Sequence, residues 1–274
     1  MSSIGALAAR PGLTVVLPTY NERDRLSELI ERIFDAWDGD PDAVAMGAVE
    51  IIVVDDNSPD GTGVQADILA REYRICVIHR SGRLGLGSAV LEGFAAAHAD
   101  LIAVMDADLS HPPQLLPRLV RVLRQNDVDV VVASRYVRGG AIKDWSLWRL
   151  MLSRVACWLA RRLTPARDAM SGFFVLRRDC LAGEPLSARG FKIGLELLVR
   201  TRPRAIAEVP YVFVGRTAGK SKMGPNEALR YLKQLWDLYR YRSHFTANGV
   251  PRYIALAAEP LVPATGRPKS ALQN

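Results

Sequence analysis

Blocks of apolar and polar residues alternate along the first part of the chain and predict strands and helices in turn. Unbroken apolar runs rich in Val, Ile and Leu are typical of strands buried on both faces of a sheet. Between these runs, apolar residues recur with the spacing of one helix face. The predicted strands cover residues 13–17, 49–54, 75–79, 101–105 and 128–133, and the predicted helices cover about 26–34, 63–73, 85–97 and 114–125. This alternation predicts an α/β fold with a mostly parallel, Rossmann-like sheet and helices on both faces.

The strand predicted over residues 101–105 leads directly into Asp106-Ala107-Asp108. Side chains at positions i and i+2 of an extended segment point the same way, so Asp106 and Asp108 can present two carboxylates to one point. Open α/β sheets bind their ligands at this carboxyl end of the strands. Two hard oxygen donors suit Mg²⁺ or Mn²⁺, held mostly through substrate phosphates. Because Asp is also common in turns, the isolated motif is equally compatible with an ordinary loop.

Acidic residues also follow the first two predicted strands, at Glu22 and at Asp55 and Asp56. In a parallel sheet these residues should face the same edge as Asp106 and Asp108. Acids gathered there repel one another unless they bind a cation or accept hydrogen bonds from a ribose or a base. Tyr20, beside Glu22, is expected to flank a nucleobase or to be a simple loop aromatic.

Two other α/β classes fit the chain less well. A nicotinamide-binding Rossmann domain needs Gly-x-Gly-x-x-Gly after the first strand, but residues 18–22 there contain no glycine. A sugar nucleotidyltransferase would carry a Gly-rich basic loop at the same place, and none is present. Phosphate-binding P-loop, zinc-protease and serine-hydrolase motifs are absent as well.

The charges divide the chain of 274 residues into an acidic part and a basic part. Residues 1–140 hold 20 Asp and Glu against 13 Lys and Arg, whereas residues 141–274 hold 9 against 23. The basic part suggests a polyanionic partner such as an anionic lipid, a phosphorylated molecule or nucleic acid. No recognised nucleic-acid-binding motif supports the last of these. The three scattered cysteines are expected to be small buried residues in a reducing compartment.

Two segments of the basic part combine apolar residues, Trp and Arg. Residues 145–163 and 226–241 are too interrupted by charge to span a bilayer, but they fit helices that lie at a membrane interface or pack on the core. No signal peptide is evident in residues 1–12, and no apolar run is long enough for a transmembrane helix. We therefore expect an N-terminal tail over residues 1–12, one domain over 13–245 and a loose C-terminal tail over 246–274.

An ordered set of motifs resembles the dolichol-phosphate (polyprenyl-phosphate) mannose synthases, inverting family 2 glycosyltransferases with the GT-A fold. The motifs are Pro18-Thr19-Tyr20-Asn21-Glu22, Asp55-Asp56-Asn57-Ser58-Pro59-Asp60-Gly61-Thr62, Asp106-Ala107-Asp108-Leu109-Ser110-His111-Pro112-Pro113, Ser134-Arg135-Tyr136, Ser171-Gly172-Phe173-Phe174 and Gly190-Phe191-Lys192-Ile193. Each motif alone is weak to moderate, but the ordered set is specific and covers residues 13–241.

The resemblance implies a role for individual positions. The guanine and ribose of GDP-mannose would contact Pro18, Tyr20, Glu22, Val54 and Asp56. Asp106, Ala107 and Asp108 would contact the nucleotide and the metal. Ser110 would be a third metal ligand, at a position where relatives often carry Gln. The donor sugar and phosphates would lie near Arg135 and Lys192, and under a basic loop that contains Arg216 and Lys222.

The expected activity is transfer of mannose from GDP-mannose to a polyprenyl phosphate with inversion, catalysed with Asp106, Asp108, Arg216 and Lys222. The resemblance further implies a peripheral enzyme at the cytoplasmic face of a membrane, with a separate membrane-anchoring protein as a conceivable partner. The alternatives are a family 2 transferase that uses UDP-glucose or another donor or acceptor, and a non-enzymatic membrane scaffold. The Gln-x-x-Arg-Trp motif usual in processive relatives is absent.

Overall fold

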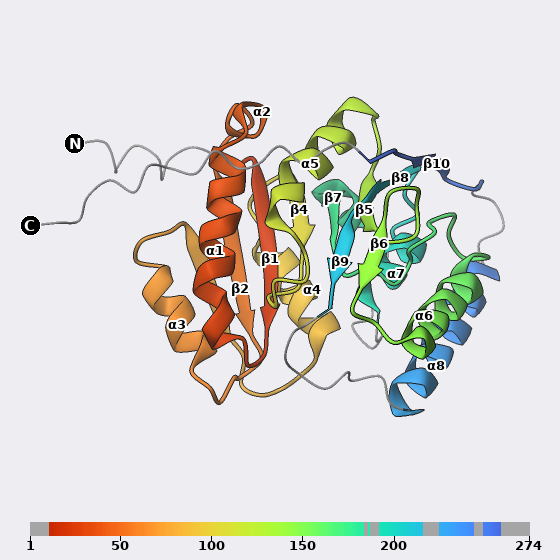
Figure 1. Ribbon diagram of the computed structural model, residues 1–274, viewed down its shortest axis with the longest axis horizontal. Helices are drawn as coiled ribbons and strands as arrows, with labels where there is room; N and C mark the ends of the chain where they lie inside the picture. The colour runs from red at the N-terminus through yellow and green to blue at the C-terminus, as the bar shows by residue number, and fades with distance from the viewer. Residues whose placement is uncertain (1–10, 184–185, 187–191, 216–224, 244–248, 259–274) are drawn as a thin grey trace, which may run out of the picture.

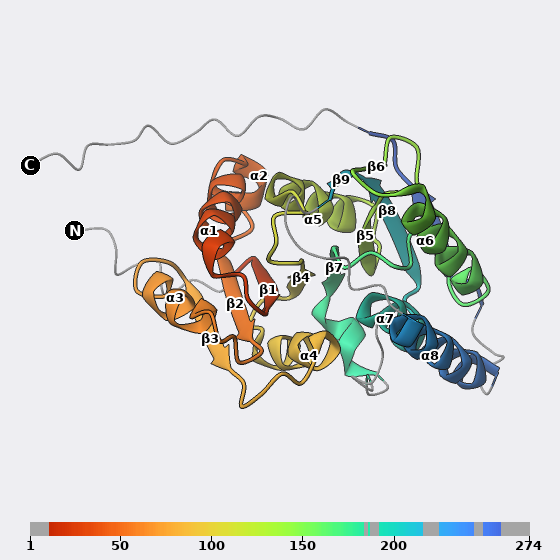
Figure 2. The same cartoon turned by 60° about the horizontal axis from the view of Figure 1, so that its bottom comes forward.

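An eight-stranded sheet forms the centre of the molecule, and helices cover both of its faces (Figures 1 and 2). The computed structural model describes residues 11–183, 186, 192–215, 225–243 and 249–258. The strands are β1 (Leu13–Thr19), β2 (Val49–Asp55), β3 (Ile75–His79), β4 (Leu101–Val104), β5 (Val130–Ser134), β7 (Phe174–Arg177), β8 (Ala205–Pro210) and β10 (Arg252–Ala255). Their order across the sheet is β10-β8-β5-β7-β4-β1-β2-β3. A separate pair is formed by β6 (Ala141–Lys143) and β9 (Val212–Val214).

All strand pairs of the large sheet are parallel except those of β7, which runs antiparallel to both β4 and β5. The mostly parallel sheet predicted from the sequence is therefore confirmed. The helices are α1 (Arg23–Asp38), α2 (Pro41–Val44), α3 (Thr62–Leu69), α4 (Leu86–Ala96), α5 (Leu116–Gln125), α6 (Leu147–Ala160), α7 (Ile193–Arg200) and α8 (Pro225–Ser243), with short 3₁₀ turns η2 (Pro113–Leu115) and η3 (Arg178–Ala182).

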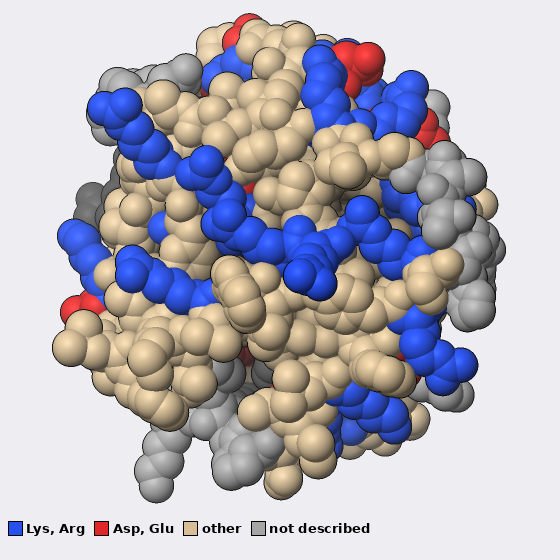
Figure 3. Space-filling model, turned by 90° about the vertical axis from the view of Figure 1, so that its right-hand side faces the viewer, with Lys and Arg blue, Asp and Glu red and all other residues tan. Residues whose placement is uncertain are grey.

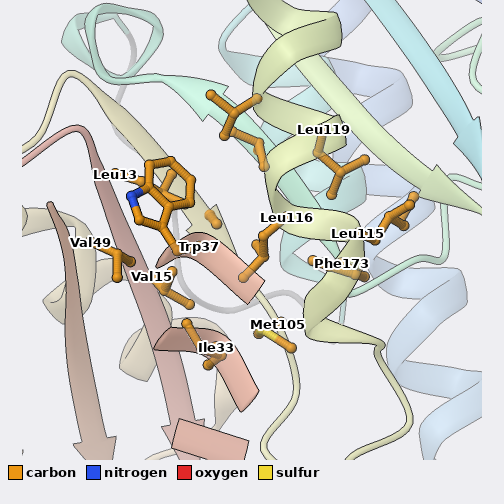
Figure 4. Close-up of a cluster of buried hydrophobic side chains, with 14 of the residues drawn as sticks. Leu13, Val15, Ile33, Trp37, Val49, Met105, Leu115, Leu116, Leu119 and Phe173 are labelled. Carbon is orange, nitrogen blue, oxygen red and sulfur yellow. The ribbon is translucent and has the colours of Figure 1, made fainter. Parts of the chain in front are cut away.

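Two apolar layers hold the helices to the sheet. On one face, α1, α3 and α5 pack against the strands. Trp37 of α1 lies in this layer and is only 1% exposed (Figure 4). On the other face, α4 and α7 cover the sheet. At Gly93 of α4 an added Cβ would lie 2.3 Å from Cγ1 of Val16 on β1, so a side chain there would force this helix away from the sheet. The third apolar cluster joins α6, α7 and α8.

The register of the central strands brings the acidic strand ends together. Thr19 at the end of β1 pairs with Asp55 at the end of β2, and Val16 of β1 pairs with Val104 at the end of β4. Because β1 lies between β2 and β4, the loops after all three strands leave from the same edge of the sheet.

Several details differ from the sequence-based expectation. The helix expected to end near residue 34 continues to Asp38 and is followed by α2, which was not predicted, and the helix expected over 63–73 ends at Leu69. The tail expected to be loose contributes β10, which pairs with β8, so the sheet extends beyond residue 245. Cys76 is exposed rather than buried, because β3 is an edge strand.

The two amphipathic segments are helices, as predicted. Residues 147–160 of the first segment form α6, and the whole second segment lies within α8. Both lie side by side at one end of the molecule, and the Tyr231 and Tyr239 hydroxyls of α8 donate to the carbonyls of Ala156 and Leu159 in α6. Within the described part of the chain, no helix combines the length and the apolar character needed to cross a membrane.

Candidate active site

The loop after β4 is shaped by a buried histidine. Nδ1 of His111 accepts a hydrogen bond from the backbone N–H of Asp106 (3.0 Å), and its ring stacks on Phe173 with centroids 5.0 Å apart. Burial lowers the pKa of His111, although the negative charges of Asp106 and Asp108 oppose this shift. The imidazole is therefore a neutral acceptor that holds the loop. Oδ2 of Asp106 lies 3.9 Å from Nε2 of His111, and the charge of Asp108 also acts on this ring. That the two carboxylates face one point stays a prediction.

The two carboxylates have different surroundings. The side chain of Asp106 is 36% exposed, and a Cβ on Gly172 would lie only 3.4 Å from its Oδ1. Asp108 is buried, and its Oδ1 accepts hydrogen bonds from the backbone N–H and the hydroxyl of Ser110 (3.0 and 2.5 Å). Ser110 thus orients Asp108, and its role as a metal ligand stays a prediction. The described residues hold no cluster of three or more His, Cys, Asp or Glu that could bind a metal ion.

At the end of β2, Asp56 organises the loop that follows β3. Its Oδ1 accepts from Arg80 (2.6 Å) and from the backbone N–H of Leu84 (2.9 Å), and its Oδ2 accepts from Gly85 (2.9 Å). Asp56 and the Arg80 guanidinium are both buried. Asp56, which the resemblance assigned to nucleotide binding, therefore has three protein hydrogen bonds that fix the neighbouring loop. Any contact with a nucleotide would use its remaining lone pairs.

The loop after β1 carries the predicted aromatic and acid. The Arg83 guanidinium lies 4.2 Å from the centre of the Tyr20 ring. The Glu22 carboxylate forms an ion pair with the Arg25 guanidinium at 3.1 Å. Tyr20 is half-buried at this edge, so part of its ring is accessible to a base. Among the other predicted donor contacts, Pro18, Val54 and Ala107 are buried.

Arg135, predicted to lie near the donor phosphates, is paired with a residue that the sequence did not single out. Its Nε and Nη2 donate to the two carboxylate oxygens of Asp168, both at 2.7 Å, and its backbone N–H donates to the same side chain at 2.9 Å. Burial alone would lower the pKa of Arg135, but the charge and hydrogen bonds of Asp168 outweigh it and raise the pKa. The pair lies close enough to His111 to influence its pKa, which places it beside the acidic loop.

Asp168 is itself held by Glu208 of β8. The two oxygens of Glu208 accept from the backbone N–H groups of Arg167 and Asp168 at 2.7 and 2.8 Å, and the Tyr253 hydroxyl of β10 donates to Glu208 at 2.5 Å. Glu208 and Asp168 are both fully buried. A continuous hydrogen-bonded chain therefore links the C-terminal strand to Arg135.

Lys192 lies at the start of α7, and α8 fixes its backbone. Gln234 of α8, which is 6% exposed, accepts from the Lys192 N–H and donates to the Lys192 carbonyl, both at 2.9 Å. Burial and the charge of Arg135 lower the pKa of Lys192, whereas Asp106 and Asp168 raise it. The Lys192 ammonium thus lies among the same charges as Arg135. Arg216 and Lys222 lie outside the described residues.

Asp106, Asp108 and Arg135 all act electrostatically on His111, and Asp106 and Arg135 act on Lys192, but the residues that hold these side chains were not predicted. His111 stood within a motif, but no role was inferred for it. Asp168 and Gln234 belong to no recognised motif, and each acts 33 or 42 residues away from its partner. An acid close before Ser171-Gly172 was the one available signal for Asp168.

The chain matches the model of glycosyl transferase family 2 over residues 14–182. It therefore belongs to this family and is a glycosyltransferase, as the ordered motifs predicted. Curated relatives include the dolichol-phosphate mannosyltransferase of Saccharomyces cerevisiae, which is 39% identical over 88% of this chain and 91% of its own length. The protein of the same name from Pyrococcus furiosus is 39% identical over 84% of this chain, which spans 64% of that relative's length.

Solved structures confirm the GT-A fold. A mannosyltransferase from Pyrobaculum calidifontis, determined with GDP-Man and Mn²⁺, has a TM-score of 0.55 at 20% identity and covers 89% of this chain and 67% of its own. Mannosyl-3-phosphoglycerate synthase from Rubrobacter xylanophilus has a TM-score of 0.59 at 20% identity, with 86% of this chain and 76% of its own covered. At these identities the likeness concerns the fold.

Proposed function

We propose that this glycosyltransferase moves mannose from GDP-mannose to a polyprenyl phosphate and forms a β-linked polyprenyl-phosphate mannose. The observation that carries the proposal is that the loop with Asp106 and Asp108 leaves the same sheet edge as the loops after β1 and β2, and that Asp106 and Arg135 both act electrostatically on Lys192. The names of the relatives from Saccharomyces cerevisiae and Pyrococcus furiosus support the choice of donor sugar and lipid acceptor. Family 2 enzymes that use UDP-glucose remain the competing assignment.

The acidic pair fits a Mg²⁺ or Mn²⁺ ion. Asp106 is partly exposed and Asp108 is oriented by Ser110, so two carboxylates can meet one cation while its other ligands come from diphosphate and water. The Pyrobaculum calidifontis structure contains Mn²⁺ together with GDP-Man. A divalent cation bound here would supply positive charge beside the diphosphate of the donor.

The reaction requires little proton transfer. A phosphate oxygen of the acceptor, already anionic near neutral pH, would form the new bond to the anomeric carbon from the face opposite GDP. The bond from that carbon to the diphosphate oxygen would break, and its electron pair would leave with GDP, so the configuration inverts. Arg135 and Lys192, with Arg216 and Lys222 from outside the described residues, would stabilise the negative charge on the two phosphates.

The lipid acceptor requires contact with a membrane, and α6 and α8 are suited to this. Large apolar side chains project from both helices into solvent, and they are Leu147, Trp148, Met151, Val155 and Trp158 of α6 with Leu229, Leu232 and Trp236 of α8. Lys and Arg form a band across the same face, whereas Asp and Glu show mostly at its edges (Figure 3). We propose that this face adheres to the cytoplasmic surface of a membrane, alone or with a separate anchoring protein.

The decisive assay uses labelled GDP-mannose or UDP-glucose with polyprenyl phosphate in detergent, with Mg²⁺, Mn²⁺ or excess chelator. Only GDP-mannose with a divalent cation should label the lipid. Asp108→Asn should lower the rate about a hundredfold or more. Asp35→Asn, the same change at an exposed position on α1, should leave the rate unchanged. Full transfer in chelator would contradict the metal proposal, and transfer from UDP-glucose alone would contradict the donor assignment.

A further inference from the structure

The motif at residues 55–62 contains more polar side chains than the proposed function uses. Asp56 fixes the loop after β3, but no role has yet been given to Ser58 and Asp60 in the loop after β2, or to Thr62 at the start of α3. All three of these side chains accept hydrogen bonds from the backbone of the loop after β1. We call Ser58, Asp60 and Thr62 the β2 clamp.

The β2 clamp binds three consecutive backbone N–H groups. The bonds run from Asn21 to the Ser58 hydroxyl (3.1 Å), from Glu22 to the Thr62 hydroxyl (3.0 Å) and from Arg23 to the Asp60 carboxylate (3.3 Å). α1 begins at Arg23, and Glu22, its N-cap residue, makes no capping bond with its own side chain. Because the first N–H groups of a helix have no partner within the helix, α1 is capped from the neighbouring loop instead.

The clamp residues are themselves held in place. The Asp60 Oδ1 accepts from the backbone N–H and the hydroxyl of Thr62 at 3.0 and 2.6 Å, and the Ser58 hydroxyl donates to Asp55 at 2.6 Å. Thr62 and Asp55 are buried. Burial raises the pKa of Asp60, but the hydrogen bonds that it accepts, led by those from Thr62, outweigh this effect and lower the pKa. Asp60 is therefore an ionised acceptor at neutral pH.

The loop held by the clamp carries two of the expected donor contacts, Tyr20 and Glu22. Asn21 between them has a φ of 60°, in the left-handed region that side-chain-bearing residues seldom adopt. The bond from its N–H to Ser58 helps to hold this conformation, which sets the direction of the backbone at Tyr20. Within the described residues, the clamp makes no hydrogen bond to the loop after β4 that carries the acidic pair.

We propose that Ser58, Asp60 and Thr62 are positioning residues, which hold the loop after β1 so that Tyr20 and Glu22 can bind the nucleoside of the sugar donor. The clamp should then strengthen binding of the base and ribose and leave binding of the diphosphate and metal unchanged. This inference rests on the proposed function, because that proposal makes a sugar nucleotide the donor.

The test uses Asp60→Asn, which separates the two loops selectively. The amide oxygen can still accept from Thr62, but an amide N–H group then faces the Arg23 N–H. Calorimetry with Mn²⁺ compares GDP with pyrophosphate, which lacks the nucleoside. The dissociation constant of GDP should rise about tenfold, because stacking of a base on an aromatic ring is lost in part, and that of pyrophosphate should not change. The KM for GDP-mannose should rise by the same factor with kcat unchanged.

Two sets of controls distinguish positioning from stability. Thr62→Val, which removes the hydroxyl, should reproduce Asp60→Asn, whereas Thr62→Ser, which keeps it, should bind GDP like the natural chain. Asp40→Asn is the matched change beyond the other end of α1. The Asp40 carboxylate also caps a helix, since it accepts from the Ala43 N–H at 3.1 Å. Asp40→Asn should lower the melting temperature but leave both dissociation constants unchanged.

Four results would overturn the inference. These are a natural chain that binds the nucleotide no more tightly than pyrophosphate, equal weakening of both ligands in Asp60→Asn, no weakening of either, and the same weakening of GDP in Asp40→Asn. Unchanged binding of pyrophosphate also shows that the variant is folded. UDP replaces GDP if the natural chain binds UDP more tightly, so a wrong donor assignment does not alter the outcome. A natural chain that binds GDP but transfers no mannose contradicts only the proposed function.

Discussion

The pair formed by Arg135 and Asp168 allows stability and catalysis to be tested separately. Asp168 is fully buried and accepts three hydrogen bonds from Arg135, whose side chain is 7% exposed. Asp168→Asn removes the negative charge and turns an amide donor toward the guanidinium. Removing one partner of a buried pair leaves the other charge uncompensated, which costs about 3–5 kcal/mol. The melting temperature should fall by roughly 6–20 °C.

A double variant distinguishes the charge effect from a general loss of packing. Arg135→Met combined with Asp168→Leu leaves no buried charge unpaired, so its stability should return to within about 2 kcal/mol of the natural protein. Turnover of the double variant should be low, because it lacks Arg135 and with it the proposed contact with the donor. The exposed pair Arg32 and Glu28 provides a control, where Glu28→Gln should cost less than about 0.5 kcal/mol.

The measurements are thermal melting, denaturant unfolding and steady-state transfer from GDP-mannose. If Asp168→Asn has the same melting temperature as the natural protein, the buried pair does not stabilise the fold as its geometry implies. A double variant that is no more stable than Asp168→Asn would show that packing, and not the unpaired charge, dominates. High turnover in the double variant would refute the proposed role of Arg135 at the donor.

Three further changes test other contacts. His111 has a lowered pKa, so the unfolded chain takes up a proton below about pH 6.5 that the folded chain does not, and stability should fall as the pH drops. As the pH falls, the free energy of unfolding of the natural protein should drop by up to about 1.4 kcal/mol per pH unit more than that of His111→Asn. Gln234→Ala, which frees the Lys192 backbone, should lower kcat about tenfold in steady-state kinetics with little change in melting; an unchanged kcat would exclude a positioning role. Gly93→Ala should cost about 1–3 kcal/mol by crowding Val16, and a melting curve like that of the natural protein would contradict the close approach.

The elements that the sequence predicted well are those whose own apolar pattern is long. β1 and β2 are runs of seven buried residues, and α1 carries its buried residues on one face over 16 positions. Three strands of the large sheet escaped prediction: the four-residue strands β7 and β10, and β8, although all six residues of β8 are buried. β7 inserts between β4 and β5 and pairs with both, so its extended form depends on neighbours that are distant in sequence.

The residues of the candidate site likewise fall into those that the sequence could predict and those that it could not. The acids at the ends of β1, β2 and β4 could be placed on one edge, because strand direction alone decides where those ends lie. The partners of Arg135 and Lys192 could not be predicted, since Asp168 and Gln234 are single polar residues without a periodic pattern. Asp56 shows the limit of residue-by-residue transfer, because its hydrogen bonds to the following loop make it at least partly a structural residue.

The separation of charge along the chain has a structural counterpart. The first 140 residues are acidic and contribute Asp106, whereas the basic remainder contributes Lys192. The two side chains act on each other electrostatically, since the Asp106 carboxylate raises a lysine pKa that burial and Arg135 lower. In the proposed mechanism, a cation bound to the carboxylates and the basic side chains would place positive charge on both sides of the substrate phosphates. Loss of either charge should therefore weaken binding of the donor and the acceptor together, rather than of one alone.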